Sequence, residues 1–210
     1  MNSILTVINA AKSQDLTVLD SVKKEFGISG TLEDAKLAVW IKQASQMIAN
    51  HCNRVFALET VRETFRFSPN AYIQAPASTS LILNRFPVAE IIAVTENDVA
   101  LDVMDFVVDP WTGIVSRLSG DILVAWPRLK IVVDYTTGYE LLTGLPYDVE
   151  RACISLVRQI RSQSKRDPLA KRIEVPDVST VEYWVGQIGQ SGSMPPDVVD
   201  LLAPYMNLKV

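Results

Sequence analysis

The chain has 210 residues, of which 48% are hydrophobic and 21% are charged. This length and composition predict an ordinary globular protein of one or two domains that needs no disulfide or metal to hold its core. Acidic residues outnumber basic residues, 24 to 20, and the net charge of −4 argues against a dedicated nucleic-acid-binding protein that neutralises phosphates. Residues 1–15 have no positive charge before Lys12, so we expect neither a signal peptide nor a membrane-spanning segment.

Two helices are predicted near the start of the chain, after an arm or frayed turn in residues 1–15. The first helix begins at Thr17, a suitable N-cap, and ends at Gly27. The second helix has a broad apolar stripe that starts at Leu37 and runs to about Asn53. The pair predicts a helical hairpin.

The hydrophobic period changes to two from Leu58 onward. Val61, Glu63 and Phe65 alternate with threonine and arginine residues, which predicts a strand with one drier and one wetter face. Short apolar segments separated by turn residues follow at Thr79–Leu83, Val88–Thr95, Phe106–Val108, Ile114–Leu118 and Leu129–Tyr135. Connections this short indicate hairpins, so we expect an antiparallel sheet or a small barrel.

A long amphipathic helix is predicted from Pro146 to Arg166. One face of this helix is apolar and carries Val149, Cys153, Leu156, Val157 and Ile160. Another face is basic and carries Arg151, Arg158, Arg161 and Lys165. The basic face has two interpretations, a solvated surface partly paired with nearby acids or a surface turned toward phosphate or an acidic neighbouring subunit.

The last part of the chain is polar from Asp167 to Ser193 and then predicts a short, proline-led helix. Six residues of this helix are candidates for binding a partner: Pro195, Pro196, Val198, Leu201, Leu202 and Tyr205. The helix either binds another protein or docks on its own domain, and its sequence allows both. The predicted fold class is therefore α+β, a helical bundle with an inserted β region and a tethered C-terminal helix. The expected boundaries are 1–56 (helical), 57–144 (β-rich), 145–167 (helix completing the helical part) and 168–210 (arm).

No pattern in the sequence points to catalysis. His51 and Cys52 are adjacent at the end of a predicted helix, where packing is the better interpretation, and Cys52 and Cys153 are expected to be buried thiols. A cluster of acids, Glu96, Asp98, Asp102 and Asp105, lacks the spacing of a calcium loop. Phosphate-binding loops and nucleophile elbows are missing from the sequence. We therefore expect no enzyme activity, no cofactor and no metal site.

Four segments together resemble the head-to-tail connector, or adaptor, proteins of tailed bacteriophages and related gene-transfer particles. The segments are ANHCNRVF, LILNRFPVAEIIAV, IVVDYTTGYELLTGLPYDVERACISLV and MPPDVVDLLAPYM, and they cover most of the chain in the family's order. The passage through Tyr135, Gly138 and Tyr139 to a proline-led helix is the most specific of them. The chain differs from the family in its long polar connection before the last helix.

The resemblance implies a non-enzymatic virion protein, made in the host cytoplasm and located in the neck between head and tail. It implies a ring, expected to be dodecameric, that joins the portal protein to a tail-side stopper or terminator protein. Packaged DNA would pass through this ring without recognition of its sequence. No membrane partner is expected. The C-terminal helix would then bind the portal, and Pro110, Trp111 and Thr112 would contact the next ring. The basic face at Arg151, Arg158, Arg161 and Lys165 would line the DNA lumen.

Other functions remain open from the sequence. The nearest alternative is another ring of the same neck, either a stopper or a head-completion ring. A more distant one is a cytoplasmic, non-phage adaptor that binds DNA through the basic helix. An enzyme built from scattered acidic residues is the least favoured.

Overall fold

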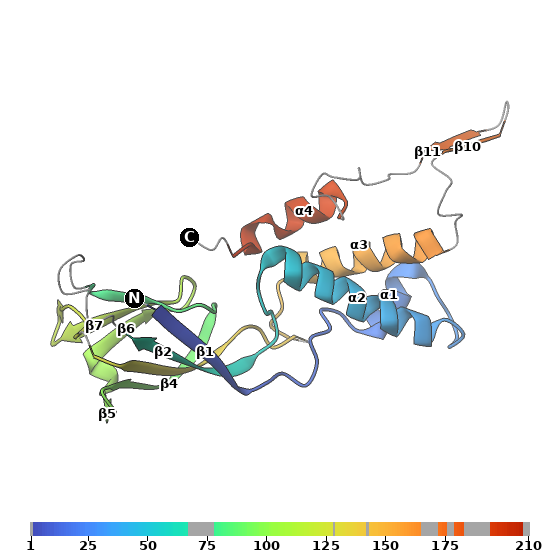
Figure 1. Ribbon diagram of the computed structural model, residues 1–210. Coiled ribbons are helices and arrows are strands. Elements are labelled where there is room, and N and C mark those ends of the chain that lie inside the picture. The colour runs from blue at the N-terminus through green and yellow to red at the C-terminus, as the bar shows by residue number, and fades with distance from the viewer. Residues whose placement is uncertain are drawn as a thin grey trace. The chain divides into compact units, whose positions relative to one another are not determined.

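The computed structural model describes residues 2–66, 78–127, 129–141, 143–164, 172–175, 179–182 and 194–207 (Figure 1). The chain divides into two compact units. The sheet unit contains Met1–Ser13 and Val55–Glu140, and the helical unit contains Gln14–Arg54 and Leu141–Val210. Four α-helices, two open antiparallel sheets and one separate two-stranded hairpin are present in the described residues, which confirms the predicted α+β class.

The larger sheet of the sheet unit has five strands in the order β1-β2-β9-β4-β5. Their bounds are Asn2–Asn9 (β1), Glu59–Arg66 (β2), Ile131–Thr137 (β9), Val88–Glu96 (β4) and Val99–Ala100 (β5). The smaller sheet has the order β3-β7-β6, and β8 also pairs with β7. Its strands are Ser80–Ile82 (β3), Ile114–Ser119 (β7), Phe106–Asp109 (β6) and Ile122–Leu123 (β8), with a 3-10 turn, η2, at Val103–Asp105. No barrel closes within the described part of the chain.

Strand β1 corrects the prediction for the start of the chain. Residues 1–15 were expected to form an arm or a frayed turn, but β1 pairs antiparallel with β2, from Ser3 opposite Phe65 to Val7 opposite Val61. The predicted helical part, 1–56, therefore differs from the structure at its beginning, because Met1–Ser13 belong to the sheet unit. The partner of β1 lies far along the chain, and local sequence patterns carry no information about such pairing.

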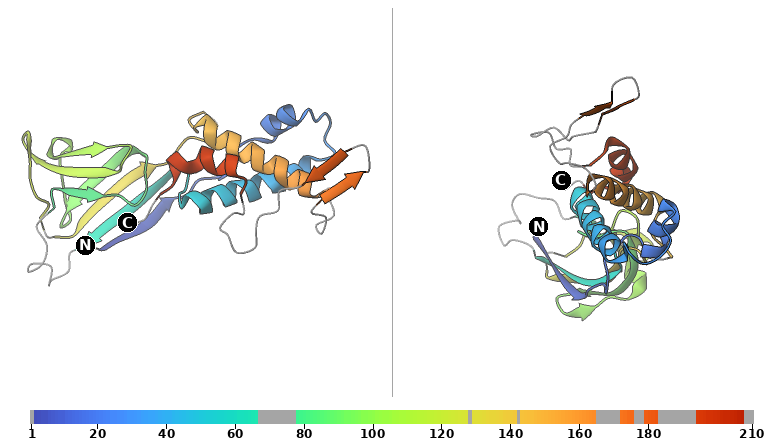
Figure 2. Two further views of the ribbon diagram at one scale, coloured as in Figure 1. Left: turned by 90° about the horizontal axis from the view of Figure 1, so that it is seen from above. Right: turned by 90° about the vertical axis from the view of Figure 1, so that its right-hand side faces the viewer.

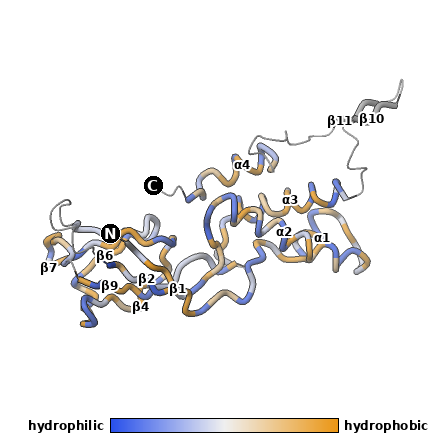
Figure 3. The backbone as a smooth tube through the Cα atoms, in the orientation of Figure 1, coloured by the Kyte–Doolittle hydropathy of each residue, from blue (hydrophilic) through white to orange (hydrophobic). Residues whose placement is uncertain are grey.

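The two sheets of the sheet unit share one hydrophobic core. Strands β2 and β9 alternate as expected, with Val61, Phe65, Val133 and Tyr135 buried on the inner face. Among the described residues Trp126 is the largest fully buried side chain, and its indole N–H donates to the Val115 carbonyl at 3.2 Å. Figure 3 shows the resulting mixture of hydrophobic and hydrophilic residues along the strands. Each large side chain buried in this way contributes about 1.5–3 kcal/mol.

A buried carboxylate lies inside this core. The side chain of Glu63 on β2 is completely buried and accepts hydrogen bonds from the Asn84 backbone N–H at 2.9 Å and from the Tyr135 hydroxyl at 3.0 Å. The Asn84 side-chain amide donates to the other oxygen of Glu63 and also contacts Ser3 of β1. Burial, together with the Glu63 charge, raises the pKa of the Tyr135 hydroxyl. Glu63 therefore joins β2, β9 and the loop between β3 and β4.

The helical unit is formed by α1 (Leu19–Phe26), α2 (Asp34–Cys52), α3 (Tyr147–Ser164) and α4 (Pro196–Leu202), with a short 3-10 turn, η3, at Ala203–Tyr205. Helix α3 matches the predicted long helix, and its buried residues Val149, Cys153, Leu156 and Val157 confirm the apolar face. Figure 2 shows α3 packed between α2 and α4. A hairpin of β10 (Arg172–Val175) and β11 (Ser179–Glu182) was not predicted.

The ends of the first two helices are as expected, but the start of α1 is not. Gly27 and Asn53 adopt left-handed backbone conformations at the C-caps of α1 and α2. The N-cap of α1 is Val18, and the Thr17 hydroxyl instead donates to the Glu150 carboxylate of α3 at 3.0 Å. The Thr17 side chain therefore links the start of α1 to α3.

We expect the Glu63→Gln variant to lose about 1–3 kcal/mol of unfolding free energy. Three donors converge on the Glu63 carboxylate, and an amide at this position turns its own N–H groups toward some of them. Urea denaturation measures the change. Glu90→Gln is the matched control, because Glu90 is exposed on β4 and the same chemical change there should cost less than about 0.5 kcal/mol. Equal stability of the two variants would contradict the structural role of Glu63.

Candidate functional site

The arginines of the predicted basic face are paired within the helical unit. Arg161 forms a two-pronged ion pair with Glu33, with Nε and Nη2 at 2.9 and 3.2 Å from the two carboxylate oxygens. Arg151 and Arg158 both donate to Glu25 Oε1, at 3.2 and 2.9 Å. The guanidinium groups of Arg158 and Arg161 also lie over the Phe26 ring. The predicted grouping of these arginines on one face is therefore confirmed, and the face contacts the end of α1.

Pairing leaves part of this charge accessible. The side chains of Arg151 and Arg158 are 58% and 55% exposed, whereas Arg161 is only 25% exposed. Three arginines facing two glutamates give the cluster one net positive charge. Lys165, the fourth predicted member, lies outside the described residues. The cluster stabilises the packing of α1 on α3 and retains two guanidinium groups that face solvent.

The C-terminal helix docks within its own unit. Val198 and Leu202 are completely buried and α4 packs against α3, while the Asn207 N–H donates to the Cys52 carbonyl at 2.8 Å. The other candidate portal-binding residues are more accessible: Pro196 is exposed, and Pro195, Leu201 and Tyr205 are half-buried. The sequence left two interpretations open for α4, and in the structure this helix packs on its own unit. The predicted tether between α3 and α4 lies mostly outside the described residues.

The turn at Pro110–Thr112 connects β6 to β7 and presents an aromatic side chain. Trp111 is 73% exposed. Its backbone N–H donates to Asp109 Oδ1 at 3.0 Å, and the Thr112 hydroxyl donates to Asp109 Oδ2 at 2.6 Å. These two hydrogen bonds, that from Thr112 first, lower the pKa of the Asp109 carboxyl. Asp109 therefore stabilises the backbone conformation of the turn, and the Trp111 side chain projects from it into solvent.

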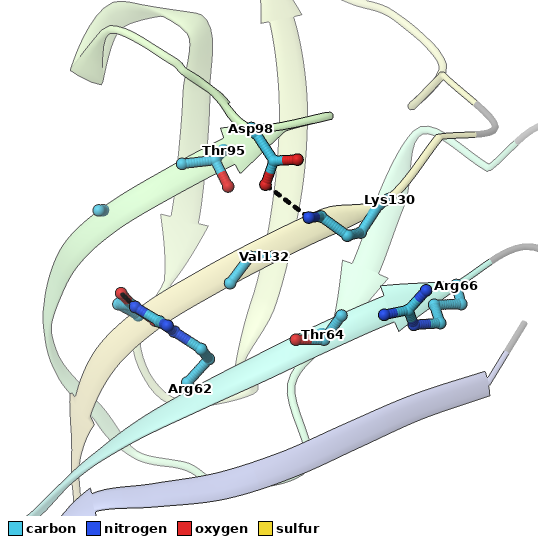
Figure 4. A pocket seen from close by; sticks show the side chains of 9 residues that line it. Arg62, Thr64, Arg66, Thr95, Asp98, Lys130 and Val132 are labelled. Atoms are coloured by element: carbon cyan, nitrogen blue, oxygen red, sulfur yellow. Dashed lines mark hydrogen bonds and ion pairs between the residues drawn. The ribbon is translucent and has the colours of Figure 1, made fainter.

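A polar hollow on the outer face of the larger sheet was not predicted. It has a volume of about 340 Å³ and is shown in Figure 4. Its lining consists of Arg62, Thr64, Arg66, Ala93, Thr95, Asp98, Lys130, Val132 and Asp134. Arg62 pairs with Asp134, with two contacts of 2.7 Å, and Lys130 pairs with Asp98. The alternation along β2 indicated this polar face, but the hollow needs three strands whose pairing the sequence does not specify.

The expected non-catalytic character of Cys52 agrees with its surroundings. Cys52 is completely buried, and burial raises the pKa of its thiol to about 11. Burial likewise raises the pKa of Cys153 to about 12, and its sulfur lies 3.6 Å from the Ser45 hydroxyl. A nucleophilic cysteine needs a lowered pKa, so neither thiol is poised for catalysis.

The acidic cluster is divided among other roles. Glu96 and Asp105 pair with Arg117, at 2.8 and 3.6 Å, and Asp98 pairs with Lys130. Asp102 caps η2 through the Met104 N–H at 3.0 Å. Among the described residues, no group of three or more His, Cys, Asp or Glu side chains is arranged to hold a metal ion.

Gly138, part of the most specific segment of the resemblance, has a structural explanation. Its φ angle is +100°, and a Cβ at this position would lie 2.4 Å from the Ala57 carbonyl oxygen. The Gly138 N–H donates to Pro87 at 3.0 Å, and the next N–H, of Tyr139, donates to Phe56 at 2.7 Å. Only glycine fits where the chain leaves β9 this close to the segment before β2.

Comparison with known protein families decides the identity. The profile of the head completion protein family matches residues 15–167, which is more than half of the chain. The chain belongs to the head completion protein family. This membership confirms the resemblance derived from the sequence and places the chain among the structural proteins of phage-like particles, not among enzymes.

Solved structures show that the fold of this head completion protein recurs in neck assemblies. A chain from the neck of an empty gene transfer agent (GTA) particle, computed with C6 symmetry, matches with a TM-score of 0.58 and 15% identity. A chain from the neck of a native GTA particle, computed with C12 symmetry, matches with a TM-score of 0.57 and 14% identity. Both matches cover 99% of this chain and 97% of the other. No curated protein matches at the level of sequence.

In the part of the chain that the structure describes, no helix is both long and apolar enough to cross a bilayer.

We expect the thiols of Cys52 and Cys153 to resist labelling by Ellman's reagent at pH 8 in the folded chain and to react fully in urea.

The raised pKa values of the two thiols also make the unfolding free energy depend on pH. Below about pH 9 both states keep the thiol protons; above it the unfolded chain loses them first, so stability falls as pH rises toward 11. Urea denaturation at pH 8 and pH 10 tests this. Cys153→Ala is the control and should reduce the pH dependence, and rapid labelling of the folded chain would contradict the burial.

Leu201 and Leu202 form a matched pair for testing α4. We expect Leu202→Ala to cost about 2–5 kcal/mol of unfolding free energy because Leu202 is completely buried. Leu201→Ala, at a half-buried position, should cost much less. Urea denaturation gives both values. If Leu202→Ala left stability unchanged but abolished capture of the portal protein, α4 would be a released binding element and its docked position would be wrong.

Proposed function

We propose that this head completion protein forms a ring in the neck of a phage-like particle, where it joins the portal of the head to the tail-side ring. The observation that carries the proposal is the end-to-end match to chains from GTA necks, which covers 99% of this chain. Those necks were computed with C6 and C12 symmetry, so a cyclic assembly is supported for a chain of this fold. A dodecamer is the expected form.

Packaged DNA passes through the ring without being recognised by sequence. The arginine cluster of α3 is the proposed face toward the lumen, and its single net positive charge in the described residues suits transit better than retention. A strongly basic surface repeated around a ring would bind the phosphate backbone tightly. The net charge of −4 on the whole chain further lowers affinity for DNA.

The contacts to neighbouring proteins are assigned to accessible side chains. The exposed side of α4, with Pro196 and the half-buried Pro195, Leu201 and Tyr205, is the proposed portal contact. Val198 and Leu202 contribute by holding α4 in place, because both are buried. The exposed Trp111 turn is the proposed contact to the stopper or terminator protein, since aromatic side chains on fixed backbones are frequent anchors at interfaces.

Another ring of the same neck is the second candidate, because the family match does not distinguish between ring positions. A cytoplasmic DNA-binding adaptor is less well supported. Its basic helix would need free arginines, whereas all three described members of the arginine cluster pair with Glu25 or Glu33.

The test is the solution mass of the chain across a concentration series, alone and with the portal protein encoded by the same genome. We expect a single large complex of fixed stoichiometry with the portal. Trp111→Ala is the companion variant and should still form this complex, but it should no longer bind the tail-side protein. Leu32→Ala, at a fully exposed position of the helical unit, is the control and should behave as the unchanged chain.

The outcomes separate the candidates. A chain that ignores the portal but forms a complex with the tail-side protein belongs to another ring of the neck. A chain that binds duplex DNA as a monomer, with affinity falling steeply as salt rises, is a DNA-binding adaptor and contradicts the ring.

A further inference from the structure

Strand β1 is an edge of the larger sheet with an unusual composition. It is eight residues long, and its sequence, NSILTVIN, contains no charged residue and no proline. Ile4 is 59% exposed and Ile8 is 48% exposed. On its inner side β1 pairs with β2, while on its outer side no described residue pairs with it. In an antiparallel strand every second residue turns its N–H and C=O away from the partner, so β1 offers a row of free hydrogen-bonding groups.

Edges of this kind are usually protected. Soluble proteins shorten their edge strands, place lysine or proline on them, or insert bulges, because an open apolar edge recruits other chains. A bulge between Val7 and Asn9 is the one such feature of β1, and it leaves the register regular from Asn2 to Val7. The first six residues of β1 are therefore an unprotected template for another strand.

The opposite edge of the same sheet, β5, is different in kind. It consists of Val99 and Ala100, follows a tight turn at Asn97 and Asp98, and, among the described residues, pairs with the end of β4. Val99 is 68% exposed. The sheet therefore ends in two unlike edges on opposite sides, β1 and β5.

Two unlike edges are what a closed ring requires. In a cyclic assembly each copy uses one surface toward the copy before it and a different surface toward the copy after it. A strand edge on one side and a different strand edge on the other satisfy this condition, and the main-chain hydrogen bonds between them need no charge. The absence of charge on β1 suits a contact that is buried in the assembled state.

We infer that β1 of one copy pairs with the β5 edge of the next copy, so that the five-stranded sheets continue from subunit to subunit around the ring. The occupant of the β1 edge is thus a second copy of this chain. The inference rests on the proposed function, because it needs a ring. It adds the surface through which the ring closes.

Chemical cross-linking tests this pairing in the full chain bound to the portal. Thr6→Cys places a thiol on β1 and Val99→Cys places one on β5, and a bis-maleimide about 8 Å long reaches between neighbouring strands in any nearby register. Within one copy the two positions are four strand spacings apart, roughly 19 Å, which the linker cannot span. The native Cys52 and Cys153 are buried and should not react.

We expect the double variant to give a ladder of covalent multimers beyond the dimer, and each single variant to stay monomeric. A dimer from Thr6→Cys alone would show that β1 pairs with β1, and would overturn the head-to-tail contact. An assembled complex without a ladder would overturn the inference and leave the proposed function standing. Failure of the unchanged chain to assemble would overturn both.

A second measurement does not depend on introduced thiols. Ile4→Lys puts a charge on the open edge and should leave the unfolding free energy within about 0.5 kcal/mol while reducing assembly with the portal at least tenfold. Ile82→Lys is the matched control, because Ile82 is 65% exposed on β3 of the smaller sheet, outside the proposed contact, and its change should not affect assembly. Equal assembly of the two variants would overturn the inference.

Discussion

The sheet unit depends on a carboxylate placed where an apolar side chain is expected. Glu63 is buried between Val61 and Phe65, and it is tolerated because the Asn84 amides and the Tyr135 hydroxyl supply donors for its oxygens. Burying a carboxylate costs several kcal/mol unless hydrogen bonds compensate. The hydrogen bonds from Asn84 to Glu63 thereby hold the β3–β4 loop in place. Arg85, the next residue after Asn84, pairs with the buried Glu59, which lies four residues before Glu63 on the same face of β2.

Local periodicity predicted the elements whose stability is local. The apolar face of α3 and the alternation of β2 and β9 follow directly from residue spacing, and the structure confirms them. Strand β1 was missed because its stability comes from β2, and the partners of the arginines were missed because Glu25 and Glu33 lie on other elements. The role of Glu63 left one signal, a charge at a drier-face position of a period-two strand. The docking of α4 left no signal in the sequence, because an apolar helix has the same residue pattern whether it packs on its own domain or on another protein.

The basic face of α3 is a poor guide to function because the partners of its arginines lie on other elements. An arginine stripe reads as an anion-binding surface until its partners are known. Here Glu25, Glu33 and the Phe26 ring satisfy most of it, so its first role is to attach α1 to α3. Exposed ion pairs contribute little stability individually, and a cluster with an aromatic platform contributes more. Three arginines face two glutamates, so one net positive charge remains to attract a ligand.

Charge pairing in the sheet unit leads to the same conclusion about assembly. Arg62, Arg85, Arg117 and Lys130 each pair with an acid of the same unit, so these four charges are largely satisfied within the unit and select a partner less strongly. Accessible main-chain groups on β1 and exposed apolar side chains, Val99 and Trp111 among them, are features that can do so. Contacts of this kind are individually weak, but in a closed ring each copy makes two of them and the last contact forms within one assembly, at high effective concentration. A chain that keeps its charges paired internally and its sheet edges open is therefore suited to assemble only when many copies are brought together.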